Sequence, residues 1–188
     1  MVSEEVDMAL DIAQEGMDHA IQHLNNELVK IRTGKASPAI LSGLLVDYYG
    51  SPTPLNQVAN VGTSDARTIT VQPWEKKMLA PIEQSIFAAN LGLTPMNDGE
   101  MIRINIPPLT EERRLNLVKQ AKHLGEESKI SLRSNRHKAL DTIKKAVKDG
   151  YPEDAGKRKE DQVDKMLHEY SDKIDKVVEA KEKDIMTV

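Results

Sequence analysis

The sequence predicts an α+β protein in which a small α/β domain is inserted between the first and second helices of a long three-helix bundle. Long stretches near both ends carry apolar residues every three or four positions, which is the pattern of helices packed lengthwise. Charged residues make up 30% of the chain and aromatic residues only 3%, a mix typical of long helices with aliphatic seams. Between the first two helical stretches, prolines and glycines recur, and they predict the inserted domain.

The first helix is expected over residues 3–31. Ser3 is the candidate N-cap, and Glu4 and Glu5 follow in the first turn, where carboxylates favour the positive end of the helix dipole. Its apolar stripe consists of Val6, Leu10, Ala13, Met17, Ala20, Leu24, Leu28 and Ile31.

The second and third helices are expected after Pro107–Pro108, with Thr110 as a cap, to about Lys148, and then over roughly 155–186. The seam of the second helix is mostly small: Val118, Ala121, Gly125, Ser128, Leu132, Asn135, Ala139, Thr142 and Ala146, widened by Leu117, Leu124, Ile130 and Ile143. The third carries Val163, Leu167, Tyr170, Ile174 and Val177 at heptad spacing. We therefore assign residues 1–31 and 107–188 to the bundle.

Residues 32–106 form the predicted inserted domain. Strand-like patterns occupy 44–49, 67–72 and 101–106, and a helix is expected over 78–89. The chain then passes twice between the two domains, and few contacts between the domains are needed at these connections. The candidate hinge residues are Arg32, Thr33, Gly34, Ile106, Pro107 and Pro108. A fixed elbow is the alternative.

Composition excludes several classes of protein. Cysteine is absent, which rules out disulfides, thiolate nucleophiles and cysteine-ligated zinc, and we expect a cytoplasmic location. No run approaches the roughly 18 apolar residues of a membrane helix, so no membrane partner is expected. The first residues carry acid where a presequence would carry base, and we expect a chain made without a targeting segment.

Signatures of catalysis are missing. The sequence contains no P-loop, dinucleotide-binding, zinc-protease or nucleophile-elbow motif. His19 and His23 have a spacing that could hold a metal, and Asp11/Glu15 or Asp172/Asp175 could form acid–base pairs, but exposed helix faces explain them more simply. We expect no catalytic residues, metal or cofactor, and a hydrolase is the least favoured hypothesis.

A basic segment stands out in this acidic chain of net charge −4. Residues 107–150 hold eleven bases and six acids, a balance of +5. Lys129, Arg133 and Arg136 fall within about 60° on a helical wheel and form a ridge that suits the phosphates of a nucleic acid. No aromatic residue is interleaved, which favours backbone or shape recognition of folded RNA over base stacking. Interhelical salt bridges to acidic neighbours explain the same pattern equally well.

Four segments, in order, resemble the bacterial and organellar ribosome recycling factors. They are Arg32-Thr33-Gly34-Lys35-Ala36-Ser37-Pro38, Val46 to Ala59, Leu91 to Pro95 with Asp98-Gly99 and Ile102-Arg103, and Pro107 to Arg114. The resemblance covers essentially the whole chain. It implies an L-shaped protein with a three-helix bundle and a small β/α/β domain. Lys35 and Glu75 depart from the family's common arginine and aspartate, but both keep the charge.

The resemblance also implies a function. Factors of this family bind the ribosome after termination and, with elongation factor G and its GTP hydrolysis, split it into subunits, while binding no nucleotide themselves. Their bundle contacts large-subunit ribosomal RNA, and its basic positions match Lys129, Arg133 and Arg136 here. Lys122 and Arg32 complete our candidate RNA-binding set, and we expect a monomer.

Two alternatives stay open. Arg32, Thr33 and Gly34 sit at the domain junction, where a structural role competes with RNA contact. We expect Gly34 to supply backbone freedom and Ser37–Pro38 to cap a short helix. The alternative function for the whole chain is a helical adaptor that binds proteins and has no RNA role.

Overall fold

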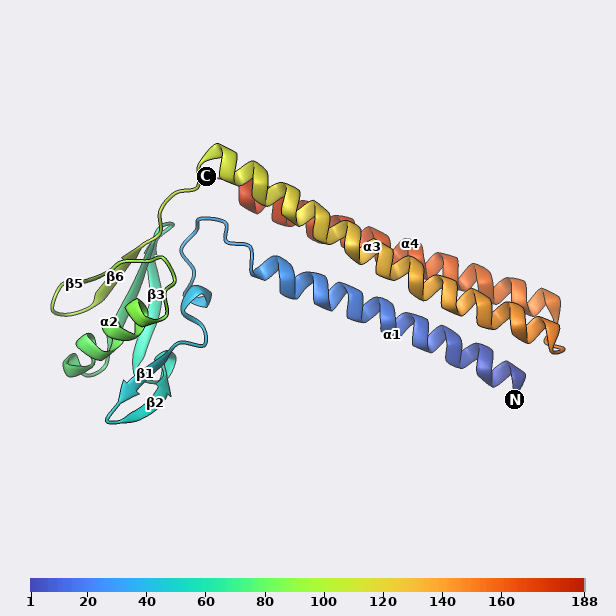
Figure 1. Ribbon diagram of the computed structural model, residues 1–188, viewed down its shortest axis with the longest axis horizontal. Helices are drawn as coiled ribbons and strands as arrows, with labels where there is room; N and C mark the ends of the chain where they lie inside the picture. Colours follow the sequence, from blue (N-terminus) through green and yellow to red (C-terminus); the bar gives the residue numbers. More distant parts are fainter. Residues whose placement is uncertain (188) are drawn as a thin grey trace. The chain divides into compact units, whose positions relative to one another are not determined.

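The computed structural model describes residues 1–187 and confirms the predicted α+β class, with a helical bundle interrupted by a sheet domain. The bundle contains α1 (Val2–Val29), α3 (Glu111–Lys148) and α4 (Glu153–Met186), which run side by side (Figure 1). The chain divides into two compact units: Met1–Thr33 with the residues from Glu111 onward, and Gly34–Thr110. No helix within residues 1–187 is long and apolar enough to cross a bilayer.

Burial in the bundle follows the predicted apolar stripes with few exceptions. Every fully buried residue of α1 lies on one face, and Val6, Met17 and Leu24 are among the most enclosed. The buried residues of α3 are Leu117, Ala121, Gly125, Ser128, Leu132, Ala139, Ile143 and Ala146. The expectation for Ile130 is wrong: its side chain is 60% exposed, because residue 130 lies on the side of α3 away from both neighbouring helices.

Small residues let α3 and α4 approach closely. A Cβ atom built on Gly125 would lie 2.8 Å from Cγ2 of Val178, and one on Gly156 would lie 2.7 Å from Cγ2 of Val147. Neither glycine could become alanine unless its neighbour moved.

The start of α1 differs from the predicted cap, and a long-range contact fastens the opposite end of the bundle. The prediction for Ser3 is wrong: α1 begins at Val2, so Ser3 already lies inside the first turn, and Met1 is the N-cap without a side-chain hydrogen bond. At the other end of the bundle, Arg114 Nη1 donates hydrogen bonds to the carbonyl oxygens of Ile185 (2.6 Å) and Thr187 (3.2 Å), which ties the last turn of α4 to the first turns of α3.

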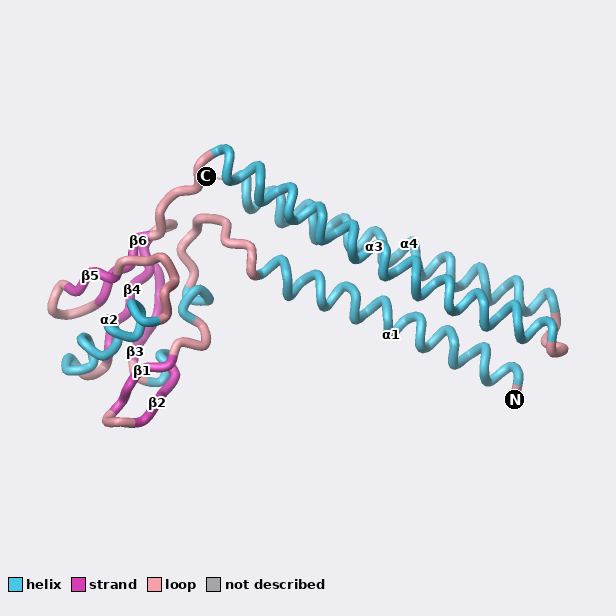
Figure 2. The backbone as a smooth tube through the Cα atoms, viewed as in Figure 1, coloured by secondary structure: helices cyan, strands magenta, loops and turns pink. Residues whose placement is uncertain are grey.

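The inserted unit contains a two-stranded hairpin and a four-stranded antiparallel sheet (Figure 2). The hairpin pairs β1 (Leu45–Tyr48) with β2 (Ser51–Pro54). The sheet has the order β3 (Ala59–Asp65), β4 (Thr68–Pro73), β6 (Ile102–Asn105), β5 (Pro95–Asn97). The unit also contains α2 (Leu79–Ala88) and short 3-10 turns at Pro38–Leu41, Leu55–Gln57 and Lys76–Met78. The predicted strands correspond to β1, β4 and β6, whereas β2, β3 and β5 were not predicted.

The core of the inserted unit lies between this sheet and α2. Ile69, Val71, Ile102 and Ile104 from the central strands are fully buried, and they belong to one apolar cluster with Ile82 and Ile86 of α2 and Val46 of β1. The alternation of buried and exposed residues on β4 and β6 is the period of two that the sequence shows.

Tyr170 gives the bundle a testable sensitivity to alkali. Its hydroxyl group donates a hydrogen bond from α4 to Asp18 of α1, and burial, followed by this bond, raises its pKa from 10.0 to about 12. Between these two pH values the native state holds a proton that the unfolded chain has released, so stability falls as pH rises. We expect Tyr170→Phe to lower the free energy of unfolding at neutral pH by about 1.5 kcal/mol.

The same substitution should flatten the stability curve between pH 10 and pH 12, as measured by urea unfolding at a series of pH values. Tyr151, which is half-buried in the bundle, provides the matched control as Tyr151→Phe. A wild-type decline over this range that persists unchanged in Tyr170→Phe would contradict the assignment.

Candidate nucleic-acid interface

One side of α3 forms a long basic face. We define the basic face as the lysine and arginine residues that fall within a sector of about 120° at 100° per residue: Lys119, Lys122, Lys129, Arg133, Arg136, Lys144 and Lys148. It extends about 44 Å along the helix axis. Glu126 is the one acid between residues 119 and 148 that shares this sector. The face contains the predicted trio and Lys122, and it adds three lysines that a longer helical wheel would have found.

Two members of the predicted trio are paired with acids on α4. Lys129 Nζ lies 2.7 Å from Oδ1 of Asp175 and 4.0 Å from Oε1 of Glu126, and the hydrogen bond to Asp175 raises the pKa of Lys129. Arg136 Nε donates to Oδ1 of Asp164 at 2.6 Å. For these two residues the interhelical salt bridges offered as the alternative explanation are therefore present.

Arg133 differs from both of its neighbours in the predicted ridge. Its side chain is exposed, and among residues 1–187 no acid or carbonyl group pairs with its guanidinium group. The same holds for the exposed Lys122 within this part of the chain. Arg133 consequently has its full set of planar donors available for a phosphate group.

Arg32 lies outside the basic face. It follows the end of α1 rather than belonging to α3, it is exposed, and it interacts with another residue of the chain. The structure thus brings Lys122, Lys129, Arg133 and Arg136 together on one helix and leaves Arg32 on a separate segment.

The predicted hinge residues are distributed over both units. Arg32 and Thr33 end the first part of the bundle unit, whereas Gly34, Ile106, Pro107 and Pro108 belong to the inserted unit, which extends to Thr110. The inserted unit continues past residue 106 because Ile106 is buried in its core. Gly34 has a φ of +78°, which confirms its expected backbone freedom, and the Oγ of Ser37 accepts a hydrogen bond from the N–H of Ala39, which confirms the expected cap.

Both connecting segments of the inserted unit are tied to the same turn between β3 and β4. The N–H of Ala36 donates to the carbonyl oxygen of Ala66 at 2.8 Å, and the N–H of Ile106 donates to that of Arg67 at 2.7 Å. A Cβ on Gly34 would lie 3.0 Å from Cγ of Leu109, so the two segments also touch. Sequence reasoning could not find this arrangement, because the turn is distant from both segments in the chain.

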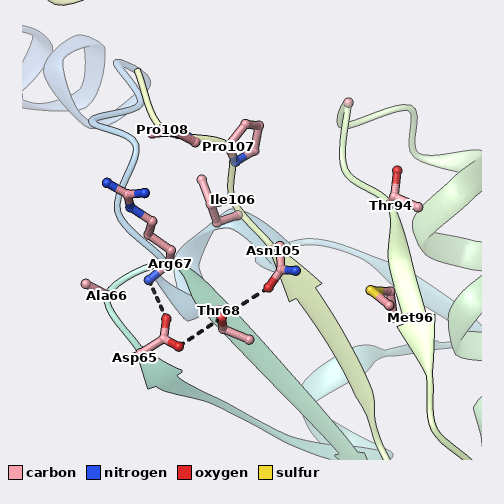
Figure 3. Close-up of a pocket in the computed structure, with 11 residues that line it drawn as sticks. Asp65, Ala66, Arg67, Thr68, Thr94, Met96, Asn105, Ile106, Pro107 and Pro108 are labelled. Carbon is pink, nitrogen blue, oxygen red and sulfur yellow. Dashed lines mark hydrogen bonds between the residues drawn. The ribbon is translucent and has the colours of Figure 1, made fainter. Parts of the chain in front are cut away.

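A hollow of about 690 Å³ lies beside this turn and is lined in part by Ile106, Pro107 and Pro108 (Figure 3). Its carboxylate, Asp65, accepts a hydrogen bond from the N–H of Arg67 at 2.8 Å and lies 3.2 Å from the hydroxyl oxygen of Thr68. The hydrogen bond from the N–H of Arg67, followed by that from the hydroxyl group of Thr68, lowers the pKa of Asp65 and favours its ionised form. The carboxylate stabilises the turn and is a poor general acid.

The histidine pair of α1 offers little for a metal. His19 Nε2 lies 3.8 Å from Oε1 of Glu15, and His19 and His23 are both exposed to solvent. Within residues 1–187, no three His, Asp or Glu side chains are arranged to hold a metal ion.

The structure is thus a long helical bundle that carries one basic face and is interrupted by an inserted sheet domain. The sequence profile of the family described as ribosome recycling factor matches residues 24–186. The chain belongs to this family.

Individual members of the family align with nearly the whole length of this chain. A ribosome-recycling factor of Christiangramia forsetii is 50% identical over 185 residues, which cover 98% of this chain and 100% of that protein. The solution structure of a ribosome recycling factor has a TM-score of 0.79 at 35% identity and 98% coverage of both chains. A model of the Thermus thermophilus factor, placed with Escherichia coli elongation factor G on a post-termination complex, is 40% identical, with a TM-score of 0.62 and coverage of 97% of this chain and 99% of that one.

Gly34 provides a test of the connection between the two segments. Alanine at this position must adopt a left-handed conformation and place its Cβ against Leu109, so we expect Gly34→Ala to lower the free energy of unfolding by about 1–2 kcal/mol. Gly43, with a φ of +81° and no atom within 4 Å of a built Cβ, is the matched control for backbone strain alone. Thermal unfolding of both variants checks this: equal losses would mean that the contact with Leu109 contributes nothing.

Proposed function

We propose that this chain acts with elongation factor G on the post-termination ribosome and splits it into subunits for reuse. Membership of the ribosome recycling factor family supports this function, as does the related structure in which a family member and elongation factor G are bound to that complex. In the structure of this chain, the observation that carries the proposal is the exposed guanidinium group of Arg133 at the centre of the basic face, with which no acid among residues 1–187 pairs.

The family is one of non-enzymatic translation factors, so the chemical step belongs to the partner. Elongation factor G binds and hydrolyses GTP, and this chain supplies binding surfaces. The protein works where bacterial ribosomes work, in the cytoplasm, and we propose that it does so as a monomer without a cofactor.

The basic face is the surface that we assign to large-subunit ribosomal RNA. Lys122, Lys129, Arg133 and Arg136 follow one another along a straight helix, as phosphate groups do along a folded RNA strand. Two features favour recognition of the backbone: the forked donors of arginine, and the lack of an aromatic side chain along the face. We keep Arg32 as a candidate contact of the same RNA from a different segment.

We further propose that the two connections between the units act as the hinge when elongation factor G displaces the inserted unit. Arg32, Thr33 and Gly34 form one connection, and Ile106, Pro107 and Pro108 form the base of the other. Because both segments are fastened to the β3–β4 turn, the inserted unit moves as one body and the bending falls on the residues that lead into the bundle.

A helical adaptor that binds only proteins is the second candidate. The exposed apolar side chains Met8 and Ile12 on α1 favour it, because together with Ala9 and Ala13 they line a shallow groove against α3. An adaptor of net charge −4 should not co-sediment with ribosomes in a salt-dependent manner.

Replacing Arg133 by alanine tests the RNA contact. We expect Arg133→Ala to weaken binding to ribosomes and to reduce the slope of log affinity against log salt by about 0.7–0.9, the contribution of one phosphate contact. Co-sedimentation at several salt concentrations measures both quantities. Arg113, near the start of α3 and outside the basic face, serves as the control in Arg113→Ala. An affinity and slope equal to those of the wild type would remove Arg133 from the interface.

The function itself is tested by splitting post-termination ribosomes. We expect subunits to appear on sucrose gradients only when this protein, elongation factor G and GTP are all present, because the work comes from GTP hydrolysis by the partner. A non-hydrolysable GTP analogue should abolish multiple turnover. Ribosomes that stay intact in the complete mixture would refute the proposed function.

A further inference from the structure

We propose that Asp164 and Asp175 of α4 weaken the RNA affinity of the basic face by holding Arg136 and Lys129 in ion pairs that RNA must exchange for phosphate contacts. The proposal rests on the RNA-binding function proposed above and concerns the regulation of the same surface. It assigns a role to acidic residues of α4, outside the basic segment that the sequence singles out.

The two acids form a matched pair on α4. They are eleven residues apart, which places them about 20° from each other on the helical wheel, and each meets a cation of α3 at a short distance. The ion pairs are Asp175 with Lys129 (2.7 Å) and Asp164 with Arg136 (2.6 Å). Arg133 lies between these cations in the sequence and has no such partner within residues 1–187.

The ion pairs are placed where a phosphate group can reach them. The side chains of Asp175 and Asp164 are 50% and 47% exposed, and those of Lys129 and Arg136 are 25% and 38% exposed. Partly exposed ion pairs are weak, so a phosphate group can replace the carboxylate. The carboxylates remain close by after the exchange and lower the positive potential of the face, which reduces the gain from RNA binding.

The two acids could instead strengthen RNA binding, so the direction in which affinity changes when they are removed distinguishes the two roles. If the acids served to position the cations, they would hold each head group in place before RNA arrives, and their removal would weaken binding. If they compete with phosphate, as we propose, their removal strengthens binding. A competing role suits a factor that must leave the ribosome after each round, since affinity differences of this kind appear mainly in the dissociation rate.

The experiment compares the full-length wild type with Asp175→Asn, Asp164→Asn and the double variant, using co-sedimentation with purified bacterial ribosomes. We expect each single substitution to tighten binding by about twofold to fivefold, the factor that corresponds to a partly exposed ion pair. The dissociation rate should fall by a similar factor. Thermal unfolding of each variant shows that the comparison is made between folded proteins.

Glu169→Gln is the matched control for net charge. Glu169 is exposed on α4, about 140° from Asp164 on the helical wheel, and its loss changes the total charge by the same amount. We expect its affinity to equal that of the wild type. Equal tightening by Glu169→Gln would overturn the proposal, because a general change in charge would then explain the effect.

A double-mutant cycle tests whether Asp175 acts through its partner. In a Lys129→Met background, the gain from Asp175→Asn should largely disappear, because the competed cation is absent. A gain that persists in full, or a loss of affinity in the Asp→Asn variants, would overturn the proposal. Failure of the RNA-binding function is a separate result: Arg133→Ala would then also bind like the wild type.

Discussion

The close packing of α3 against both of its neighbours is the constraint on which the rest of the structure depends. Ala121, Gly125, Ala139 and Ala146 bring the backbone of α3 near α1 and α4, and Gly125 leaves no room even for a methyl group against Val178. Small side chains bury little area each, so the helix must be long to gain enough contact. That length also gives α3 a continuous basic face, which flanks the packed face on the side of α4, where Lys129 and Arg136 pair with Asp175 and Asp164. One helix therefore supplies both the packing of the bundle and the basic face.

The inserted unit interrupts the helical bundle, and both of its connecting segments are held by backbone hydrogen bonds. Its four-stranded sheet closes through β4 and β6, and the chain enters and leaves beside the turn between β3 and β4. The backbone hydrogen bonds to Ala66 and Arg67 hold both segments at one point. This shared fastening to one turn is the feature on which the proposed hinge rests.

The sequence predicted those features that repeat along the chain. Three long helices follow from apolar residues at helical spacing, and β4 and β6 follow from alternation in residues such as Ile69, Val71, Ile102 and Ile104. The other strands lack this signal: β2 contains two prolines, β3 is an edge strand of mostly small and polar residues, and β5 has only three residues. They form because the neighbouring strand pairs with them, and pairing between distant segments leaves no local pattern. Ser3 failed as a cap because α1 begins at Val2, before Ser3, and local sequence locates a helix end only to within one or two residues.

The same limit applies to the basic face. A helical wheel placed Lys129, Arg133 and Arg136 on one side of α3 but could not show which of them are paired, because their partners are set by the register between α3 and α4. Counting bases treats the three as equal, whereas Lys129 and Arg136 are held in ion pairs and Arg133 has no acidic partner within residues 1–187. The affinity of such a face depends on the cations that remain available, not on net charge. Under the proposed competition, acids of the chain itself would let a protein of net charge −4 bind RNA along one helix and still release it.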